Sequence, residues 1–457
     1  MGRRAVLRSR ARIDRFKLAS RRHVRERLMD DDVIAEAVQR HAEETGAAQH
    51  DAWRRVDAYI HEIVPFFNVV AYYQIGYRAA GWLLHLFYKT SVDYADARAR
   101  ERLPRDAVLV YVMNHRSNAD YILVSHALAG QVAISYAVGE WARAFPLELA
   151  FKAFGSYFIR RKYREPLYHT VLERYVQLIT REGVTQGIFV EGGLTRDGRL
   201  RAPKVGLLDY VLGIGRDPAF AARLHIVPVA VNYDRVLEDR SLLRELDASS
   251  GGRRPSRMSQ LTEVARYVGW NVARMLTRRW KRYGRAAVVV GAPMPLGPWF
   301  SAHPELFHVE KPERLAHVQA LCDSLLVRVG ELIPVTPVPL VCAAIQSFDA
   351  EFIPHAALLE RITDMRAVLS EVNARVLSGD DGAEEIFVRA WRTLGMRRVL
   401  SETEHGYLVL PRGRPLISYY ANSVAHLLGG FAAAVRARDS LPMSSGLLFT
   451  RGPGAAG

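Results

Sequence analysis

The chain has 457 residues, 49% of them hydrophobic and 24% charged, a composition that argues against global disorder and is enough for a sizeable core. The 63 Lys and Arg residues exceed the 48 Asp and Glu residues, so the formal net charge is +15. An excess of this size predicts an anionic partner, which the charge alone leaves open among nucleic acid, an anionic membrane surface and a phosphorylated substrate. With 2 Cys and no CxxC pair, the sequence excludes a disulfide scaffold and a thiolate metal site and favours a reducing compartment.

Residues 1–62 form a basic leader that we expect to be rich in helix. Eleven basic and two acidic residues lie in residues 1–28. Three aspartates at 30–32 follow this run where a secretory signal would have its apolar region, so we expect no export signal.

Residues 63–95 are the most apolar and aromatic part of the chain. Polar side chains such as Asn68, Arg78 and His85 interrupt the segment, and its longest uncharged run is shorter than the ~20 residues of a spanning helix. We interpret it as a helical segment that either packs internally or lies in the membrane interface.

Residues 96–300 alternate short β-type runs with helical patterns, which is typical of an α/β domain. The predicted strands are Val108–Met113, Val132–Ala137, Gly187–Val190, Ile226–Asn232 and Ala286–Val290. Apolar residues at helical spacing predict a helix around residues 167–178. The β signal fades after Pro298, and residues 301–457 are predicted to form a mainly helical extension, with a helix around residues 358–369. The predicted fold is therefore α/β, a mixed sheet flanked by helices, with helical regions at both ends.

The first stretch that carries chemistry is Asn114-His-Arg-Ser-Asn-Ala-Asp120, directly after a buried-looking strand. His115 and Asp120 can meet only if His115 lies in the turn and Asp120 in the first turn of the next helix. There the carboxylate would orient the imidazole and stabilise it when it takes a proton, as a general base requires. The alternative is a capping box, Ser117-x-x-Asp120, with His115 as an ordinary loop histidine.

Three further stretches offer cations, glycines and a proline. Arg160-Arg161-Lys162 follows an apolar run and suits either a phosphate clamp or a solvated strand end. Glu191-Gly192-Gly193 ends a predicted strand, with Arg196 and Lys204 shortly after, which suits either ligand binding or a plain turn. In the fourth, Pro228 lies inside a β run, which is typical of an edge strand or a strand start.

In this order and spacing, the four stretches resemble the conserved blocks of the glycerolipid acyltransferase superfamily. The chain is most similar to the glycerol-3-phosphate acyltransferases and their relatives that acylate dihydroxyacetone phosphate. The resemblance is carried by NHRSNAD (114–120), GSYFIRR (155–161), FVEGG with TRDGRLRAPK (189–204) and IVPVAVNYDRVLE (226–238). Weaker likeness continues into the C-terminal extension.

The resemblance implies transfer of a fatty acyl group from acyl-CoA or acyl carrier protein to the 1-hydroxyl of glycerol 3-phosphate. His115 would be the general base and Asp120 its orienting carboxylate. Substrate-binding roles are implied for Arg160, Glu191, Gly192, Gly193, Arg196, Lys204 and Pro228. The family usually presents Arg-Ser-Arg after Glu-Gly-Gly, whereas this chain has Leu194-Thr195-Arg196, which leaves the acceptor open between glycerol 3-phosphate, dihydroxyacetone phosphate and another lysophospholipid.

The proposed chemistry needs no metal and no cofactor, and HExxH, Walker A and GxSxG motifs are absent from the sequence. We expect a peripheral protein on the cytoplasmic face of the cell membrane, attracted to anionic lipid, and no nucleic-acid partner. The rival interpretation, a nucleic-acid-binding protein, rests on the leader and on the basic cluster in residues 253–285. A third alternative is an inactive membrane scaffold, against which the His115 and Asp120 pair argues.

Overall fold

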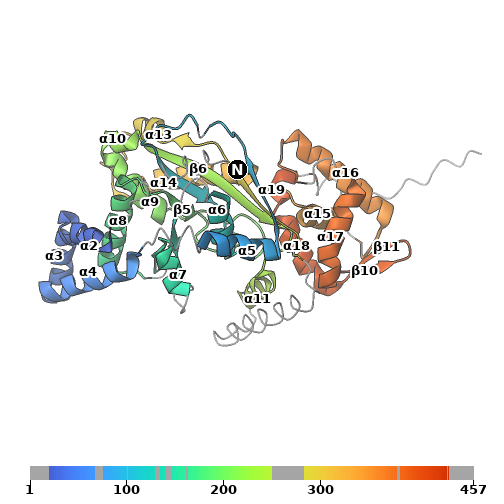
Figure 1. Cartoon of the computed structure of the whole chain (residues 1–457), viewed down its shortest axis with the longest axis horizontal. Helices are drawn as coiled ribbons and strands as arrows, with labels where there is room; N and C mark the ends of the chain where they lie inside the picture. Colours follow the sequence, from blue (N-terminus) through green and yellow to red (C-terminus); the bar gives the residue numbers. More distant parts are fainter. Residues whose placement is uncertain are drawn as a thin grey trace, which may run out of the picture.

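The computed structural model describes residues 20–66, 76–99, 101–128, 134–139, 147–160, 163–249, 282–348, 350–377, 381–429 and 431. Several expectations fall outside these residues: the leader up to residue 19, Arg161 and Lys162, and the basic cluster up to residue 281. Figure 1 shows a central sheet with the N-terminal helices at one end and the C-terminal helical region at the other.

Within the described residues, the centre of the molecule is a mixed sheet in the order β1-β7-β6-β2-β5-β3-β4, with β8 added beside β6. Its strands are β1 (Lys89–Tyr94), β2 (Val108–Met113), β3 (Ser135–Val138), β4 (Tyr157–Phe158), β5 (Gln186–Phe189), β6 (Leu224–Tyr233), β7 (Arg285–Val290) and β8 (Met294–Pro295). The β2–β5 and β2–β6 pairs are parallel, whereas β7 and β8 run antiparallel to β6. The predicted α/β fold with a mixed sheet is confirmed.

Strand β2 shows why the sheet needs helices on both faces. Every residue of Val108–Met113 is buried. Side chains alternate between faces along a strand, so Leu109, Tyr111 and Met113 enter one hydrophobic core and Val108, Val110 and Val112 the other. Helices around the sheet are α5 (Tyr77–Phe87), α6 (Asp120–Leu128), α7 (Leu147–Ala153), α8 (Pro166–Arg181), α9 (Gly206–Leu212), α10 (Pro218–Ala221), α11 (Asp239–Ser249), α13 (Gly297–Ala302) and α14 (Lys311–Glu331).

The N-terminal helices α2 (Arg21–Met29), α3 (Asp32–Thr45) and α4 (Gln49–Ile63) pack beside α8, as Figure 1 shows. The side chain of Asp31 caps α3 by accepting from the backbone N–H groups of Val33 and Ile34. Gly46, at φ +68°, ends the same helix. The helix-rich character predicted for this region is therefore seen from residue 21 onward.

The C-terminal region is mainly helical, as predicted, but it also contains a small antiparallel sheet that the sequence reading missed. Its helices are α15 (Pro337–Ser347), α16 (His355–Glu371), α17 (Ala383–Arg397), α18 (Arg414–Asn422) and α19 (Ala425–Leu428). The strands β9 (Phe352–Pro354), β10 (Leu400–Thr403) and β11 (Gly406–Val409) pair in the order β10-β11-β9. Exposed residues in β10 hide the apolar pattern from which strands are recognised.

Two sequence expectations were wrong. Residues 89–94, assigned to a helical segment, form strand β1, which pairs with β7. Pro228 lies in an inner strand and not at an edge, because β6 pairs with β2 on one side and with β7 and β8 on the other. The sheet tolerates this proline because its missing N–H faces the gap between β7 and β8, where its carbonyl oxygen accepts from Gly291 N–H at 2.8 Å.

Candidate active site

The site is built on the His–Asp loop, residues 114–119, which joins the carboxyl end of β2 to α6. Asn114 fixes the start of this loop to the neighbouring inner strand β6. Its side-chain amide donates to the Val231 carbonyl at 3.0 Å, and its side-chain oxygen accepts from Val231 N–H at 2.8 Å. The start of the loop is therefore fixed in position at the carboxyl ends of β2 and β6, where open α/β sheets place ligand sites.

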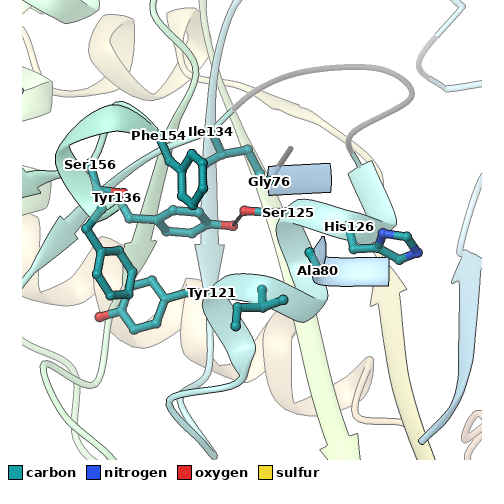
Figure 2. Close-up of a pocket in the computed structure, with 11 residues that line it drawn as sticks. Gly76, Ala80, Tyr121, Ser125, His126, Ile134, Tyr136, Phe154 and Ser156 are labelled. Carbon is teal, nitrogen blue, oxygen red and sulfur yellow. Dashed lines mark hydrogen bonds between the residues drawn. The ribbon is translucent and has the colours of Figure 1, made fainter. Parts of the chain in front are cut away.

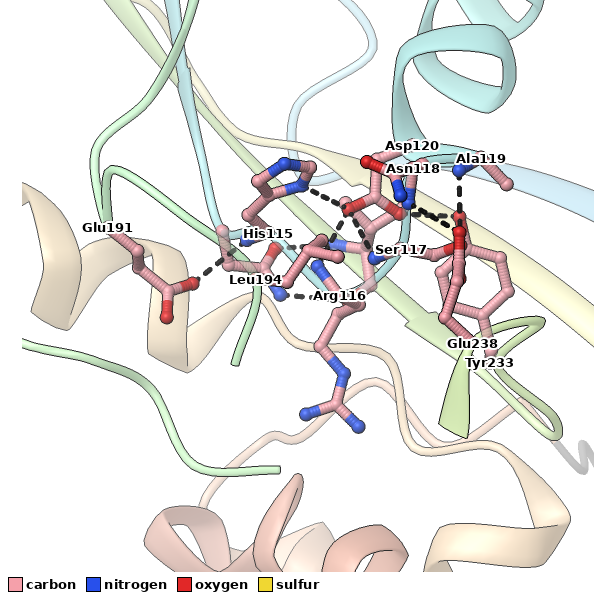
Figure 3. A network of polar contacts seen from close by, with 12 residues as sticks. His115, Arg116, Ser117, Asn118, Ala119, Asp120, Glu191, Leu194, Tyr233 and Glu238 are labelled. Atoms are coloured by element: carbon pink, nitrogen blue, oxygen red, sulfur yellow. Dashed lines mark hydrogen bonds and ion pairs between the residues drawn. The ribbon is translucent and has the colours of Figure 1, made fainter. Parts of the chain in front are cut away.

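Asp120, the first residue of α6, gathers the loop around its fully buried carboxylate (Figure 3). Its Oδ2 lies 3.0 Å from His115 Nδ1 and accepts from the backbone N–H groups of Arg116 at 2.7 Å and Ser117 at 3.0 Å. Its Oδ1 accepts from the Tyr233 hydroxyl at 2.5 Å. The predicted meeting of His115 and Asp120 is thus present, and so is the capping contact to Ser117, because one carboxylate makes both.

His115 is 1% exposed, and its imidazole lies among aromatic rings. The Phe189 ring stacks on it with centroids 4.0 Å apart, and the Tyr121 ring meets it edge-on at 5.5 Å. Because Nδ1 faces a carboxylate, the hydrogen-bond pattern assigns the proton to Nδ1 and leaves Nε2 as the basic nitrogen, directed away from Asp120. This is the arrangement that a general base needs.

The buried carboxylate of Glu191 makes hydrogen bonds to the backbone of the site. One oxygen accepts from His115 N–H at 2.8 Å and the other from Arg201 N–H at 2.8 Å. Burial raises the pKa of this carboxyl group from 4.5 to about 7, against the lowering effect of the two backbone donors. The structure thus ties Glu191 to the backbone of the site. Gly193, beside it, is buried as well.

Two of the cations implied by the resemblance already have carboxylate partners. Arg160 forks onto Glu62 at the end of α4, with distances of 2.8 and 2.5 Å, and this hydrogen bonding is the main cause of its raised pKa. Arg196 forms an exposed pair with Glu245 at 3.2 Å. The substrate roles of both residues stay predictions.

Lys204 and Gly192 lie against each other at the end of β5. Gly192 has φ +66°, and a Cβ atom there would come within 2.8 Å of the Lys204 side chain. Lys204 N–H also donates to the Val190 carbonyl at 2.7 Å. The close approach explains why this turn needs a glycine and keeps the exposed lysine beside the site.

Sequence reasoning missed two arginines at the site. Arg201 is exposed, its Nη1 donates to the Leu194 carbonyl at 3.1 Å, and it has no ion-pair partner among the described residues. Arg116 is only 3% exposed, and its Nε and Nη2 lack a hydrogen-bond partner within the same part of the chain. Both stand inside quoted motifs, but only the fold shows that one is buried and the other unpaired.

Arg116 and Gly198 connect the site to the C-terminal region. The Arg116 guanidinium donates to the Gly198 carbonyl and lies 5.1 Å from the ring centroid of Tyr419 on α18. Gly198 has φ +88°, and a Cβ atom there would lie 1.9 Å from the Tyr419 carbonyl oxygen. Nearby, the Asn422 side chain donates to the Asp197 carbonyl at 2.8 Å. The loop of residues 195–201 is therefore held between His115 and α18.

An apolar cavity of about 80 Å³ lies beside α6, the helix that follows the His–Asp loop (Figure 2). Its lining comes from α5, α6, β3 and α7, including Ala80, Tyr121, Tyr136 and Phe151. Tyr121 is shared, because its ring both lines the cavity and meets His115. The base thus lies one aromatic ring away from an apolar compartment.

Among the described residues, no group of three or more His, Cys, Asp and Glu side chains is placed to hold a metal ion. In the same part of the chain, we find no helix with the length and hydropathy needed to cross a bilayer.

Known families match this chain in two separate segments. Residues 96–232 match the acyltransferase family model, and residues 270–437 match the model of the glycerol-3-phosphate acyltransferase C-terminal region. The first match covers strands β2 to β5, most of β6 and the His–Asp loop, so the class of domain that this part of the fold and the site define is an acyltransferase domain. The second match is more specific: together with the relatives below, it shows that the chain is similar to glycerol-3-phosphate acyltransferases over both segments.

Curated relatives agree over most of this chain. A glycerol-3-phosphate acyltransferase of Aeromonas hydrophila is 28% identical over 430 residues, covering 90% of this chain and 50% of that protein. One of Xanthomonas campestris is 28% identical over 428 residues, covering 90% of this chain and 46% of that protein. The chain thus spans about half the length of these relatives. Among solved structures, the 1-acyl-sn-glycerophosphate acyltransferase of Thermotoga maritima matches with 18% identity and a TM-score of 0.30, covering 55% of this chain and 76% of that one.

Proposed function

We propose that this chain is a glycerol-3-phosphate 1-O-acyltransferase, which transfers a fatty acyl group from acyl-CoA or acyl carrier protein to the sn-1 hydroxyl to give lysophosphatidate. This reaction is the first step of phospholipid synthesis. The observation that carries the proposal is the buried hydrogen bond between His115 Nδ1 and Asp120 Oδ2, 3.0 Å long, at the carboxyl end of an inner strand.

In the proposed reaction, His115 Nε2 takes the proton of the acceptor hydroxyl. At the same time, the hydroxyl oxygen attacks the carbonyl carbon of the thioester. The new ester bond forms, the carbon–sulfur bond breaks, and the thiolate leaves with the electron pair. Asp120 keeps the imidazole in the reactive tautomer and stabilises the imidazolium formed on proton transfer. No acyl-enzyme intermediate is needed, because the acceptor itself is the nucleophile.

The apolar cavity supports an acyl donor at this site. Its lining is dominated by aromatic and aliphatic residues, so it offers a hydrocarbon chain the environment that it prefers to water. Tyr121 joins the cavity to His115, which would place a thioester at the imidazole when its chain enters the cavity. We assign this cavity to the first part of the acyl chain.

The acceptor's phosphate group calls for cations beside the base. Arg201 and Lys204 are exposed there and have no ion-pair partner in the part of the chain that the structure describes. Arg201 meets the carbonyl of Leu194, the position at which the family usually has arginine. We therefore assign the phosphate first to Arg201 and Lys204, with Arg196 and Arg160 available once they exchange their carboxylate partners for phosphate.

Membrane contact is proposed through two of the helices that line the cavity. Trp82 on α5 is 62% exposed and Leu149 on α7 is 55% exposed. Both helices line the cavity, so a lipid surface touching these side chains would lie next to the acyl donor's entry. With the positive net charge, this supports a peripheral protein on the anionic cytoplasmic face of the membrane.

The test is a direct assay of the purified chain with detergent or anionic vesicles. Labelled glycerol 3-phosphate, dihydroxyacetone phosphate and lysophosphatidate are each offered with acyl-CoA and with acyl carrier protein. We expect glycerol 3-phosphate to be acylated fastest, and dihydroxyacetone phosphate is the alternative acceptor because of Leu194. Preference for lysophosphatidate, or no acylation of any acceptor, would overturn the proposal.

A further inference from the structure

The segment between β6 and α11 makes hydrogen bonds to the His–Asp loop and to Asp120. We call Tyr233–Asp239 the positioning arm. It begins at the last residue of β6 and ends at the first residue of α11. Figure 3 shows two of its side chains, Tyr233 and Glu238, pointing into the loop.

Tyr233 supplies the bond that holds the second oxygen of Asp120. Oδ2 of Asp120 has three donors from within the sequence motif, whereas the donor to Oδ1 is the Tyr233 hydroxyl, at 2.5 Å. A carboxylate bonded through one oxygen alone can turn about its Cβ–Cγ bond. The hydroxyl stops this rotation and so fixes the direction of the bond to His115.

The hydroxyl of Tyr233 stays protonated and acts as a donor. Its pKa is raised well above 10, first by complete burial and then by the Asp120 charge. The ring is 0% exposed and packs against Tyr88 with centroids 5.4 Å apart. The Tyr88 hydroxyl in turn donates to the Arg235 carbonyl at 2.7 Å, so the ring and the arm's backbone hold each other in place.

Glu238 makes a second contact with the loop. Its carboxylate accepts from the Ser117 hydroxyl at 2.7 Å and from Asn118 N–H at 3.1 Å. Burial raises its pKa, and the neighbouring Asp120 charge raises it further, against the lowering effect of Ser117. Tyr233, at the start of the arm, therefore bonds to Asp120, and Glu238, near its end, bonds to residues 117–118.

The last residue of the arm is anchored in the C-terminal region. Asp239 forms a buried ion pair with Arg397 at the end of α17 and accepts from the Tyr420 hydroxyl at 2.8 Å. The same hydroxyl oxygen accepts from Val236 N–H at 3.0 Å, inside the arm. The chain of contacts thus runs from α17 and α18 through the arm to Asp120 and His115.

We propose that the positioning arm sets the geometry of the catalytic pair, with Tyr233 as the positioning residue for Asp120 and Glu238 as the one for the His–Asp loop. The inference rests on the proposed function, because its consequence is read in acyl transfer. It gives the C-terminal region a part in catalysis without contact with either substrate.

The principal test is Tyr233→Phe, which removes one hydroxyl and keeps the ring. We expect kcat to fall about 10- to 100-fold, the usual range for losing a hydrogen bond to a charged group, with the acceptor KM changed less than threefold.

Without the Tyr233 hydroxyl as a donor, the Asp120 charge is less dispersed and holds a proton on His115 more strongly. The acid limb of the kcat profile therefore moves to higher pH. The charged and titratable groups facing Asp120 are His115, Tyr233, Glu238 and Tyr419, and Tyr88 faces Tyr233.

Tyr175→Phe is the matched control, because its fully buried hydroxyl on α8 has no hydrogen-bond partner within the described residues. It should leave both kcat and the pH profile unchanged. A Tyr233→Phe enzyme with the wild-type kcat and acid limb would overturn the role of Tyr233, while wild-type activity would still uphold the proposed function.

Glu238→Gln tests the arm separately in case Tyr233→Phe folds poorly. The amide can accept from only one of the two donors, so we expect a fall in kcat of at least fivefold at an unchanged acceptor KM. A wild-type kcat in this folded variant would overturn the role of the arm. An inactive wild-type protein would instead refute the proposed function itself.

Discussion

At Gly198, adding a single methyl group should disrupt the packing between the active-site loop and α18 of the C-terminal region. Its φ of +88° suits glycine, and an L residue there costs about 1–2 kcal/mol. In Gly198→Ala the new Cβ would also lie 1.9 Å from the Tyr419 carbonyl oxygen, whereas real Cβ atoms keep at least 3.0 Å. Either the loop or α18 must therefore move by about an ångström, which as overpacking costs a further ~1–3 kcal/mol.

Gly183→Ala is the matched control, because Gly183 has φ +77° but no atom within 4 Å of its added Cβ. We expect it to lose about 1–2 kcal/mol in urea unfolding and to keep its kcat. Gly198→Ala should lose about 2–5 kcal/mol, and its kcat should fall at least tenfold. The reason for the fall is that Thr195, on the same loop, donates to the His115 carbonyl at 3.2 Å. Equal stability and kcat for the two variants would refute the reasoning.

Three further predictions concern the charges around the site. Arg201→Gln should raise the glycerol 3-phosphate KM about 10- to 100-fold in steady-state assays. The control is Arg223→Gln, because Arg223 directly precedes β6 and pairs with Asp106; it should leave this KM unchanged. Equal effects of the two substitutions would contradict the assignment of the phosphate to Arg201. Glu62→Gln should lower both the thermal midpoint and the acceptor KM, because it undocks α4 and releases Arg160; an unchanged KM would count against a phosphate role for Arg160. The carboxyl group of Glu191 binds its proton more tightly in the folded protein than in the unfolded chain. Its contribution to the free energy of unfolding therefore falls as pH rises from 4.5 to about 7. Glu191→Gln should remove that decline in urea midpoints measured across this range, and an identical slope in variant and wild type would contradict the raised pKa.

Local patterns in the sequence predicted several strands of the sheet and the contact between His115 and Asp120. Strand β2 was predicted with its observed bounds, because six consecutive apolar residues have few alternatives to a buried strand. The contact between His115 and Asp120 followed from the only placement in which a turn and a helix start bring them together. The residues involved are close in sequence, which is why one sequence sufficed.

What the sequence could not predict depends on distant contacts. Tyr233 and Glu238 lie more than a hundred residues after the loop that they hold, and Arg397 is 158 residues from Asp239. Arg160 looked available in the sequence, but the fold brings Glu62 to it. Partners of this kind follow from topology, which hydrophobic periodicity does not encode.

The central claim is that His115 is the base in acyl transfer to a phosphorylated acceptor. The most direct measurement is the rate of free thiol release from acyl-CoA, with and without glycerol 3-phosphate, for wild type and a folded His115→Ala variant. If acyl carrier protein is the donor that supports transfer, its acyl thioester replaces acyl-CoA. We predict that thiol release by wild type depends on the acceptor and falls about 10²- to 10⁴-fold in the variant. Release independent of glycerol 3-phosphate, or equal in both proteins, would contradict this account.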